Sequence, residues 1–422
     1  MNVFEELRAR GFVHQATSED LAEILGREKV VCYAGFDPTS DSLHIGNLVI
    51  IMGLAWFQRG GHRPIVVMGG ATGMIGDPSG KSKERNLLDT EQIRRNLEAQ
   101  RVQFERFLDF GEGGALLVNN ADWLGRFGYL EFLRDVGKHF RLGEMLAKET
   151  VKSRITSEAG ISYTEFSYMM LQAYDFLHLS DTYGCSFQVG GGDQWGNVTS
   201  GIDLIRKLRG RQAHGIVFPL LLDSSGQKMG KTSEGERVWL DPEKTSPYKF
   251  YQHWINIPDD KVVSYLKFFT FLPLDEIVET ERAAEEAPEK RIAQKRLAEE
   301  VTRIVHGEEG LGAATRATNI IFGGEITGVD EKTLADIFAD VPSATLPRAR
   351  LDEGIGVVDL LVESGGAKGK GAARRLIDGG GVYLNNRRVD SADRTVGPDD
   401  LVAGPNLVIR QGKKNYRLVK FE

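Results

Sequence analysis

The segment that most constrains the fold is a strand–helix–strand pattern near the N-terminus. An apolar run at residues 30–33 leads through a loop of Gly, Asp, Pro and Ser into an apolar helical pattern at 48–57. After a Gly-Gly turn a second apolar run follows at 64–68. This order predicts a βαβ unit with parallel strands and a right-handed crossover. In such folds ligands bind at the carboxyl ends of the strands, so we expect a site in the loops that follow these two strands.

The rest of the chain divides by pattern into further parts. Short apolar runs at 187–189 and 216–222 extend the α/β region, and no G-x-G-x-x-G fingerprint indicates a dinucleotide site. We predict an α/β fold with four parts: a Rossmann-like parallel-sheet catalytic domain (1–245), a helical domain (246–323), a linker with a short helix near 332–339 (324–353), and a small α+β domain (354–422). Within the last part we expect helices at 357–364 and 370–378 and strands near 381–384, 407–410 and 416–419.

Composition narrows the class of protein. Hydrophobic residues make up 41% of the 422 residues, and the two cysteines, Cys32 and Cys185, are too few for a disulfide framework. The sequence contains no apolar run of 18 residues and no apolar leader core, so we expect a cytoplasmic protein without membrane association. The formal charge is −7, yet residues 350–422 carry 13 Lys and Arg against 10 Asp and Glu. A basic module on an acidic body indicates either a polyanion-binding surface or a solvated tail.

Two distant motifs offer groups suited to phosphate. His44 and Asn47 share one face of a helix start, where backbone N–H groups and the helix dipole favour anions. Far downstream, Lys228-Met229-Gly230-Lys231-Thr232 follows a predicted strand and a glycine-bearing turn. Taken alone, a histidine at a helix start is more often a surface residue, and a lysine pair in a loop is more often merely solvated. The preceding run of Gly35, Phe36, Asp37, Pro38 and Thr39 favours the phosphate interpretation for His44.

A third cationic loop and a polar helical stripe complete the candidate chemistry. Lys81 and Arg85 lie in a glycine- and proline-marked loop, for which an exposed surface loop is an equally good interpretation. Tyr168, Gln172 and Asp175 occupy positions i, i+4 and i+7 of an otherwise apolar helix. A buried carboxylate needs a partner, so this stripe indicates either a structural Arg pair or the wall of a pocket.

A glycine run marks a further place where backbone and ligand meet. Gln188 precedes three consecutive glycines, and Asp193 and Gln194 follow them. Glycines without a Cβ allow close approach of a ligand. The Asp193 carboxylate is suited to accept hydrogen bonds from ribose hydroxyls.

The two phosphate motifs together resemble the HIGH and KMSKS signatures of class I aminoacyl-tRNA synthetases. The helical stripe and the glycine run narrow the resemblance to bacterial-type tyrosyl-tRNA synthetases, and the likeness covers essentially the whole chain. It implies a tyrosine–tRNA ligase that forms tyrosyl-adenylate from L-tyrosine and ATP and then charges the 3′ end of tRNA(Tyr). A tryptophanyl-type synthetase and a non-catalytic RNA-binding relative of the fold are the alternatives.

The resemblance also implies roles for individual residues. Three departures from the family pattern stand out: Asn47 in place of a second His, Gly230 inside KMGKT, and Gly192 in place of Ser. The implied catalytic residues are His44, Asn47, Lys81, Arg85, Lys228, Lys231 and Thr232. The implied tyrosine-binding residues are Tyr33, Asp77, Tyr168, Gln172, Asp175, Gln188 and Gln194. The implied ATP-binding residues are Gly35, Asp37, Thr39, His44, Gly46, Gly191, Asp193 and Lys231.

The resemblance further implies partners and domain roles. ATP enters as the magnesium complex and is a substrate; no tightly bound cofactor and no protein-held metal are expected. The chain is expected to form a homodimer through an insertion in the catalytic domain. The helical domain would contact the tRNA anticodon arm, and the last domain resembles the S4-like RNA-binding domain of a small-subunit ribosomal protein. Its candidate phosphate contacts are Arg374, Arg375, Arg387, Arg388, Lys413 and Lys414.

Overall fold

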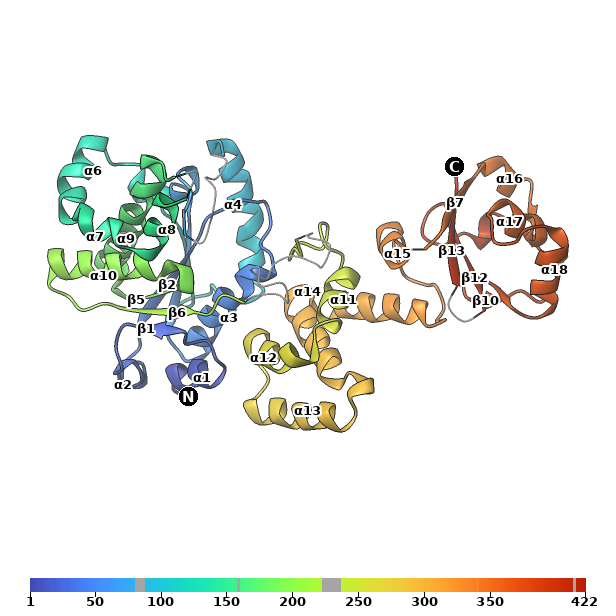
Figure 1. The fold of residues 1–422 in the computed structure, drawn as a ribbon, viewed down its shortest axis with the longest axis horizontal. Coiled ribbons are helices and arrows are strands. Elements are labelled where there is room, and N and C mark those ends of the chain that lie inside the picture. Colours follow the sequence, from blue (N-terminus) through green and yellow to red (C-terminus); the bar gives the residue numbers. More distant parts are fainter. Residues whose placement is uncertain (80–87, 158–159, 222–236, 340, 413–414) are drawn as a thin grey trace. The chain divides into compact units, whose positions relative to one another are not determined.

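A computed structural model describes residues 1–79, 88–157, 160–221, 237–339, 341–412 and 415–422 (Figure 1). The chain forms two compact units, one comprising residues 1–241 and 257–297 and the other residues 242–256 and 298–422. Within the described ranges, no helix has the length and the apolar character needed to cross a bilayer. The boundaries of the four predicted domains stay a prediction.

The first unit is built on a six-stranded sheet in the order β1-β6-β5-β2-β3-β4. Its five central and outer strands from β6 to β4 are parallel, and only β1 joins antiparallel, to β6. The α/β prediction is confirmed, including the parallel pairing within the first βαβ unit. The strands are β1 (Gln15–Ala16), β2 (Val31–Phe36), β3 (Arg63–Met68), β4 (Leu116–Asn119), β5 (Cys185–Gly191) and β6 (His214–Phe218).

Three long helices pack against this sheet, and two of them contribute residues to the pocket described below. Helix α3 (Ile45–Arg59) contacts β2 and β3, whereas α9 (Tyr163–Tyr183) and α10 (Trp195–Arg209) lie on the other side of the sheet, as Figure 1 shows. Helix α9 begins where Ser162 accepts a hydrogen bond from the Glu165 amide and ends at Gly184 in the left-handed region (φ 65°), which glycine adopts without strain. The apolar residues of α3 and β2 are almost all buried, so both elements belong to the core of this unit.

The remaining helices of the first unit surround this core. The buried Arg10 guanidinium of the N-terminal helix donates to the Lys267 and Leu272 carbonyls, which ties residues 257–297 to this unit. The helices are α1 (Val3–Ala9), α2 (Leu21–Arg27), α4 (Thr90–Phe104), α5 (Ala121–Leu124), α6 (Tyr129–Asp135), α7 (Leu142–Leu146), α8 (Glu149–Ile155), α12 (Asp259–Phe269) and α13 (Leu274–Glu286), with short 3-10 turns η1 (Thr72–Met74), η2 (Gly137–His139), η3 (Gly192–Gln194) and η4 (Pro288–Lys290).

The second unit combines helices with a five-stranded sheet in the order β10-β9-β12-β13-β7. The residues of α14 (Ile292–Ile321) are divided between the two units, and Gly307 interrupts it with a non-helical backbone. The other elements are α11 (Pro247–Ile255), α15 (Glu331–Ile337), β7 (Ser343–Leu346), α16 (Arg348–Asp352), β8 (Ile355–Gly356), α17 (Val357–Glu363), α18 (Lys370–Asp378), β9 (Val382–Leu384), β10 (Arg387–Arg388), β11 (Thr395–Val396), η5 (Pro398–Asp400), β12 (Asn406–Gln411) and β13 (Asn415–Phe421).

The stretch expected to be a linker contains ordered structure. β7 pairs in parallel with β13 and so belongs to the C-terminal sheet. Its Leu346 side chain is buried in the same apolar cluster as Leu407 and Phe421. Residues 343–346 are therefore part of a folded domain, which corrects the expectation of a linker there; the expected short helix is present as α15.

Candidate active site

A pocket of about 730 Å³ opens at the carboxyl ends of β2, β3 and β5 in the first unit. All the predicted site residues that the structure describes line it. These residues are Tyr33, Gly35, Asp37, Thr39, His44, Gly46, Asn47, Asp77, Tyr168, Gln172, Asp175, Gln188, Gly191, Asp193 and Gln194. Lys81, Arg85, Lys228, Lys231 and Thr232 lie outside the described residues. Within the described ranges, no group of three or more His, Cys, Asp or Glu side chains is placed to hold a metal ion.

His44 and Asn47 together form the N-terminal cap of α3. The Gly46 amide donates to His44 Nδ1 (3.0 Å), and the His44 amide donates to Asn47 Oδ1 (3.0 Å). Because Nδ1 accepts, the ring proton of a neutral His44 resides on Nε2. Asn47 Oδ1 accepts the hydrogen bond that caps the helix. The side-chain nitrogen of Asn47 is therefore the atom that can donate a hydrogen bond to an anion. Asn47 thus keeps one donor for the pocket while closing the helix end.

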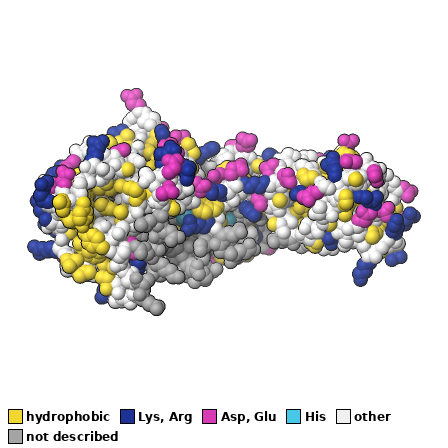
Figure 2. Space-filling view, turned by 90° about the horizontal axis from the view of Figure 1, so that it is seen from above, with side chains coloured by type: hydrophobic (Ala, Val, Ile, Leu, Met, Phe, Trp, Pro, Cys, Tyr) yellow, Lys and Arg dark blue, Asp and Glu magenta, His cyan; other side chains and the backbone are white. Residues whose placement is uncertain are grey.

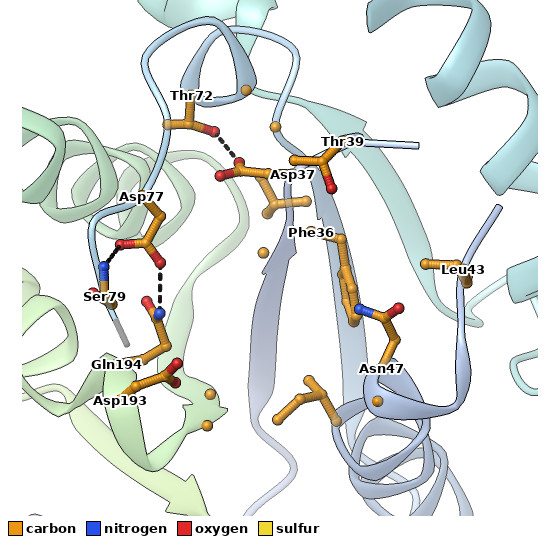
Figure 3. Close-up of a pocket in the computed structure, with 18 of the residues that line it drawn as sticks. Phe36, Asp37, Thr39, Leu43, Asn47, Thr72, Asp77, Ser79, Asp193 and Gln194 are labelled. Atoms are coloured by element: carbon orange, nitrogen blue, oxygen red, sulfur yellow. Dashed lines mark hydrogen bonds between the residues drawn. The ribbon is translucent and has the colours of Figure 1, made fainter. Parts of the chain in front are cut away.

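The Asp37 carboxylate joins two walls of the pocket. Thr72 Oγ1 donates to Asp37 Oδ1 (2.7 Å) and Tyr168 Oη donates to Asp37 Oδ2 (2.9 Å). Figure 3 shows the Thr72 contact. A Cβ on Gly69 would lie 2.1 Å from Asp37 Oδ1, so only glycine leaves room for this pair. At Gly35 a Cβ would meet no atom within 4 Å among the described residues, which leaves the strand backbone open to the pocket.

Asp175 is a buried carboxylate held by two neutral donors. Trp123 Nε1 donates to its Oδ1 (2.7 Å) and Asn120 Nδ2 donates to its Oδ2 (3.1 Å). Burial raises the pKa of Asp175 to about 7, although both hydrogen bonds act to lower it. Of the two expectations for this stripe, the structure favours the pocket wall. The buried Arg154 of this region instead pairs with Glu165 (2.7 Å) at the start of α9.

Tyr33 lies beside Asp175, and its hydroxyl is a candidate contact for a ligand. The side chain is 1% exposed, and its Oη has no hydrogen-bond partner among the described residues. Burial raises the pKa of Tyr33 well above its usual value, and the Asp175 charge adds to the rise. Gln188 on β5 is the strand partner of Tyr33 on β2. Its buried Oε1 also has no hydrogen-bond partner among the described residues. A buried polar atom without a partner is costly, so two of them on a pocket wall indicate a polar ligand.

A second group of lining residues forms a connected polar network. Gln194 Nε2 donates to Asp77 Oδ2 (2.7 Å) and the Ser79 amide donates to Asp77 Oδ1 (2.9 Å), as Figure 3 shows. Asn197 Nδ2 donates to Gln172 Oε1 (3.0 Å) and to Gln194 Oε1 (3.1 Å). The pocket therefore has an end with Tyr33 and Asp175 and a wall of amides and a carboxylate.

Sequence reasoning missed four supporting residues: Thr72, Asn120, Trp123 and Asn197. Asn120 and Trp123 follow β4, a four-residue strand that the apolar pattern did not predict. A signal was present, because Asn119-Asn120 directly follows the apolar run Leu116–Val118 and so marks a strand's carboxyl end. Asn197 lies three residues after Gln194, close to the glycine run in sequence.

Comparisons with known proteins show the family to which the chain belongs. Residues 26–323 match the family model "tRNA synthetases class I (W and Y)", and residues 333–419 match "Tyrosine--tRNA ligase SYY-like C-terminal domain". A tyrosine–tRNA ligase of Roseiflexus castenholzii is 51% identical over 421 residues, 99% of each chain. One of Bacillus caldotenax is 50% identical over 427 residues, 100% of each chain.

A solved structure also resembles this chain. A C-terminally truncated mitochondrial tyrosyl-tRNA synthetase of Aspergillus nidulans superimposes with a TM-score of 0.68 at 31% identity, covering 76% of this chain and 94% of its own. The family matches together span both units. The chain therefore belongs to the class I tRNA synthetases of the tryptophan and tyrosine group and, within that group, to the tyrosine–tRNA ligases.

Proposed function

We propose that the pocket activates L-tyrosine with MgATP and that the enzyme then charges tRNA(Tyr). The observation that carries the choice of amino acid is the Tyr33 hydroxyl, which is buried beside the Asp175 carboxylate and has no hydrogen-bond partner among the residues that the structure describes. The phenol hydroxyl of a tyrosine substrate can accept a hydrogen bond from the Tyr33 hydroxyl and donate one to the Asp175 carboxylate. An indole N–H can only donate, so tryptophan would offer no acceptor to the Tyr33 hydroxyl proton.

The chemistry takes two displacements. A tyrosine carboxylate oxygen attacks the α-phosphorus of ATP, an O–P bond forms, and the bond to the bridging oxygen breaks as pyrophosphate leaves. A ribose hydroxyl at the 3′ end of tRNA next attacks the adenylate carbonyl, loses its proton, and AMP departs. Neither step requires a covalent enzyme nucleophile. Charge stabilisation and positioning are the enzyme's contribution.

The residues divide between these tasks. His44 Nε2–H and the Asn47 amide, at the start of α3, are assigned to phosphate oxygens, and Asp193 to the ribose hydroxyls of ATP. Lys81, Arg85, Lys228, Lys231 and Thr232, outside the described residues, are assigned to the triphosphate because of their resemblance to the family motifs. Asp77, Tyr168 and Gln172 are assigned to the tyrosine ammonium.

The C-terminal domain is assigned to tRNA. Arg374 and Arg375 are exposed on α18, and Arg387 and Arg388 are exposed on β10. Figure 2 shows Lys and Arg side chains over this part of the chain. Guanidinium groups on a folded surface suit phosphate contacts that position RNA. We assign residues 246–323 to the anticodon arm on the family resemblance, and place the enzyme in the cytoplasm, where translation requires it.

An exposed apolar patch supports a homodimer. Figure 2 shows hydrophobic side chains gathered at one end of the first unit, where Figure 1 places α6 and α7. Its large exposed members are Tyr129, Leu130, Leu142, Leu146, Ile155 and Tyr163. Patches of this kind mark association surfaces. Sedimentation should show a dimer that Leu130→Asp, at a residue 78% exposed, converts to monomer; a monomeric wild-type chain at micromolar concentration would refute the assignment.

One pair of assays tests the function. Exchange of labelled pyrophosphate into ATP, run with each of the twenty amino acids, should proceed with tyrosine and not with tryptophan. Charging of bulk tRNA should follow the same preference. Exchange with tryptophan instead would identify a tryptophanyl-type enzyme. Absence of exchange with any amino acid would identify a non-catalytic relative.

A further inference from the structure

Asn197 sits behind the pocket wall and not in it. It lies on the first turn of α10, is 4% exposed, and is not among the described residues that line the pocket. Its Nδ2 nevertheless reaches three residues that do line it: Gln172 on α9, Gln194 at the end of η3 and, at the longer distance of 3.5 Å, Ser79 Oγ. One buried amide therefore connects two elements of the site.

The direction of these hydrogen bonds is set by Asp77. A carboxylate accepts, so Gln194 presents Nε2 to Asp77 Oδ2 (2.7 Å) and turns its Oε1 away. That oxygen faces Asn197, which must present its NH₂ group (3.1 Å). The same NH₂ group then requires an oxygen from Gln172 (3.0 Å). Each amide in the chain has one orientation that satisfies its neighbour, and reversal of any one would oppose two like groups.

The consequence is a set of acceptors on three residues that line the pocket. An ammonium has three N–H donors and no acceptor. Tyr168 gives its own proton to Asp37 (2.9 Å), so its oxygen can only accept further bonds. Asp77 offers a carboxylate, and Gln172, held by Asn197, offers its carbonyl oxygen with a second lone pair. We propose that Asn197 is a positioning residue that fixes the Gln172 amide with its oxygen toward the tyrosine ammonium; this rests on the proposed function.

The test compares two ligands that differ only in that ammonium. L-Tyrosine and 3-(4-hydroxyphenyl)propionate share the phenol and the carboxylate, and only the first carries the amino group. Their dissociation constants are measured by titration calorimetry for the wild type, Asn197→Leu and Asn197→Ala. Ser200→Ala on the same helix is the matched control, because the Ser200 hydroxyl bonds only to the Gly196 carbonyl of its own helix among the contacts described (2.8 Å).

The ratio of the two dissociation constants is the readout. In both Asn197 variants the constant for L-tyrosine should rise relative to that for the propionate by about 2- to 13-fold, the cost of immobilising one side chain on binding. Ser200→Ala should leave the ratio unchanged. In a Gln172→Ala background, Asn197→Leu should no longer alter it, because the residue through which Asn197 acts is gone.

Three outcomes would overturn the proposal. Equal weakening of both ligands would show that Asn197 merely supports the fold of the pocket. An unchanged ratio in both variants would show that Gln172 needs no orienting partner. A full effect in the Gln172→Ala background would show a different route. Binding of the propionate reports that each variant retains its pocket, and failure of the wild type to bind L-tyrosine would instead refute the proposed function.

Discussion

Tyr33→Phe should make the enzyme less selective without making it less stable. In the free protein, Tyr33 Oη has no hydrogen-bond partner among the described residues, so its removal breaks no described bond. The ring keeps its contact with Phe176 at a centroid distance of 5.2 Å. An unpaired buried polar group costs about 1–3 kcal/mol. The free energy of unfolding should therefore stay constant or rise, by no more than that amount.

The cost appears when substrate binds. A neutral hydrogen bond between Tyr33 and the phenol oxygen contributes about 0.5–1.5 kcal/mol. Its loss should lower the ratio of kcat/KM for tyrosine over phenylalanine by about 2- to 13-fold. Phenylalanine itself should be used as well as before or slightly better, because the hydroxyl it left unpaired is gone. Pyrophosphate exchange with each amino acid measures both values.

Tyr168→Phe is the matched control for stability. It removes the same hydroxyl from a tyrosine that donates to the Asp37 carboxylate at 2.9 Å, a bond of about 1.5–3 kcal/mol. Urea unfolding followed by tryptophan fluorescence reports mainly the first unit, which holds Trp56, Trp123, Trp195 and Trp239 of the five tryptophans. Equal destabilisation by the two substitutions, or an unchanged selectivity in Tyr33→Phe, would show that the pocket is oriented differently.

Three further predictions concern charge. Burial raises the pKa of Asp175 from the ordinary 3.8 to about 7, so the folded protein binds this proton more tightly than the unfolded chain does. The resulting contribution to the free energy of unfolding should be fully present below pH 3.8 and lost as pH rises through 7. kcat/KM for tyrosine should rise through pH 7 as the accepting carboxylate forms, and Asp175→Asn should flatten that profile; a flat wild-type profile would contradict it. Lys228→Ala and Lys231→Ala should slow adenylate formation in pre-steady-state assays with tyrosine affinity unchanged, because these lysines meet charge that develops in the transition state; unchanged rates in both would refute the assignment. Arg374→Ala with Arg375→Ala should raise KM for tRNA by a factor that shrinks as salt is added, because the variant releases fewer counterions, and should leave exchange unaltered, whereas charging at the wild-type KM would remove α18 from the RNA surface.

The sequence predicted the elements whose pattern is local. The βαβ unit around α3 and the helices α17 and α18 are long or regular enough for their apolar spacing to identify them. β4 and β7 have four residues each, and their strand character comes from pairing with β3 and β13, which no local pattern encodes. Helix α13 lies within the stretch predicted to be helical (246–323), although charged residues make up most of it and only Ile277 is buried.

The site divides in the same way. Motif residues such as His44 and Asp193 could be proposed from their place after a strand, and the structure puts them in one pocket. The sequence could not show which hydrogen bonds hold these side chains in place. Asn120 and Trp123 reach Asp175 across more than 50 positions of sequence, and the capping of α3 by Asn47 depends on a backbone angle.

The donors around Asp175 restrict how this enzyme can be redesigned for other amino acids. Trp123 Nε1 and Asn120 Nδ2 both point at the carboxylate, so a substitution such as Asp175→Gly, made to admit a bulkier para-substituent, leaves two buried N–H groups without an acceptor. A new substrate must supply that acceptor, or the loop after β4 must change at the same time. Libraries that vary Tyr33 and Asp175 should therefore vary Asn120 and Trp123 with them. The residues around Asp77, which are assigned to the amino group of the substrate, can be left unchanged.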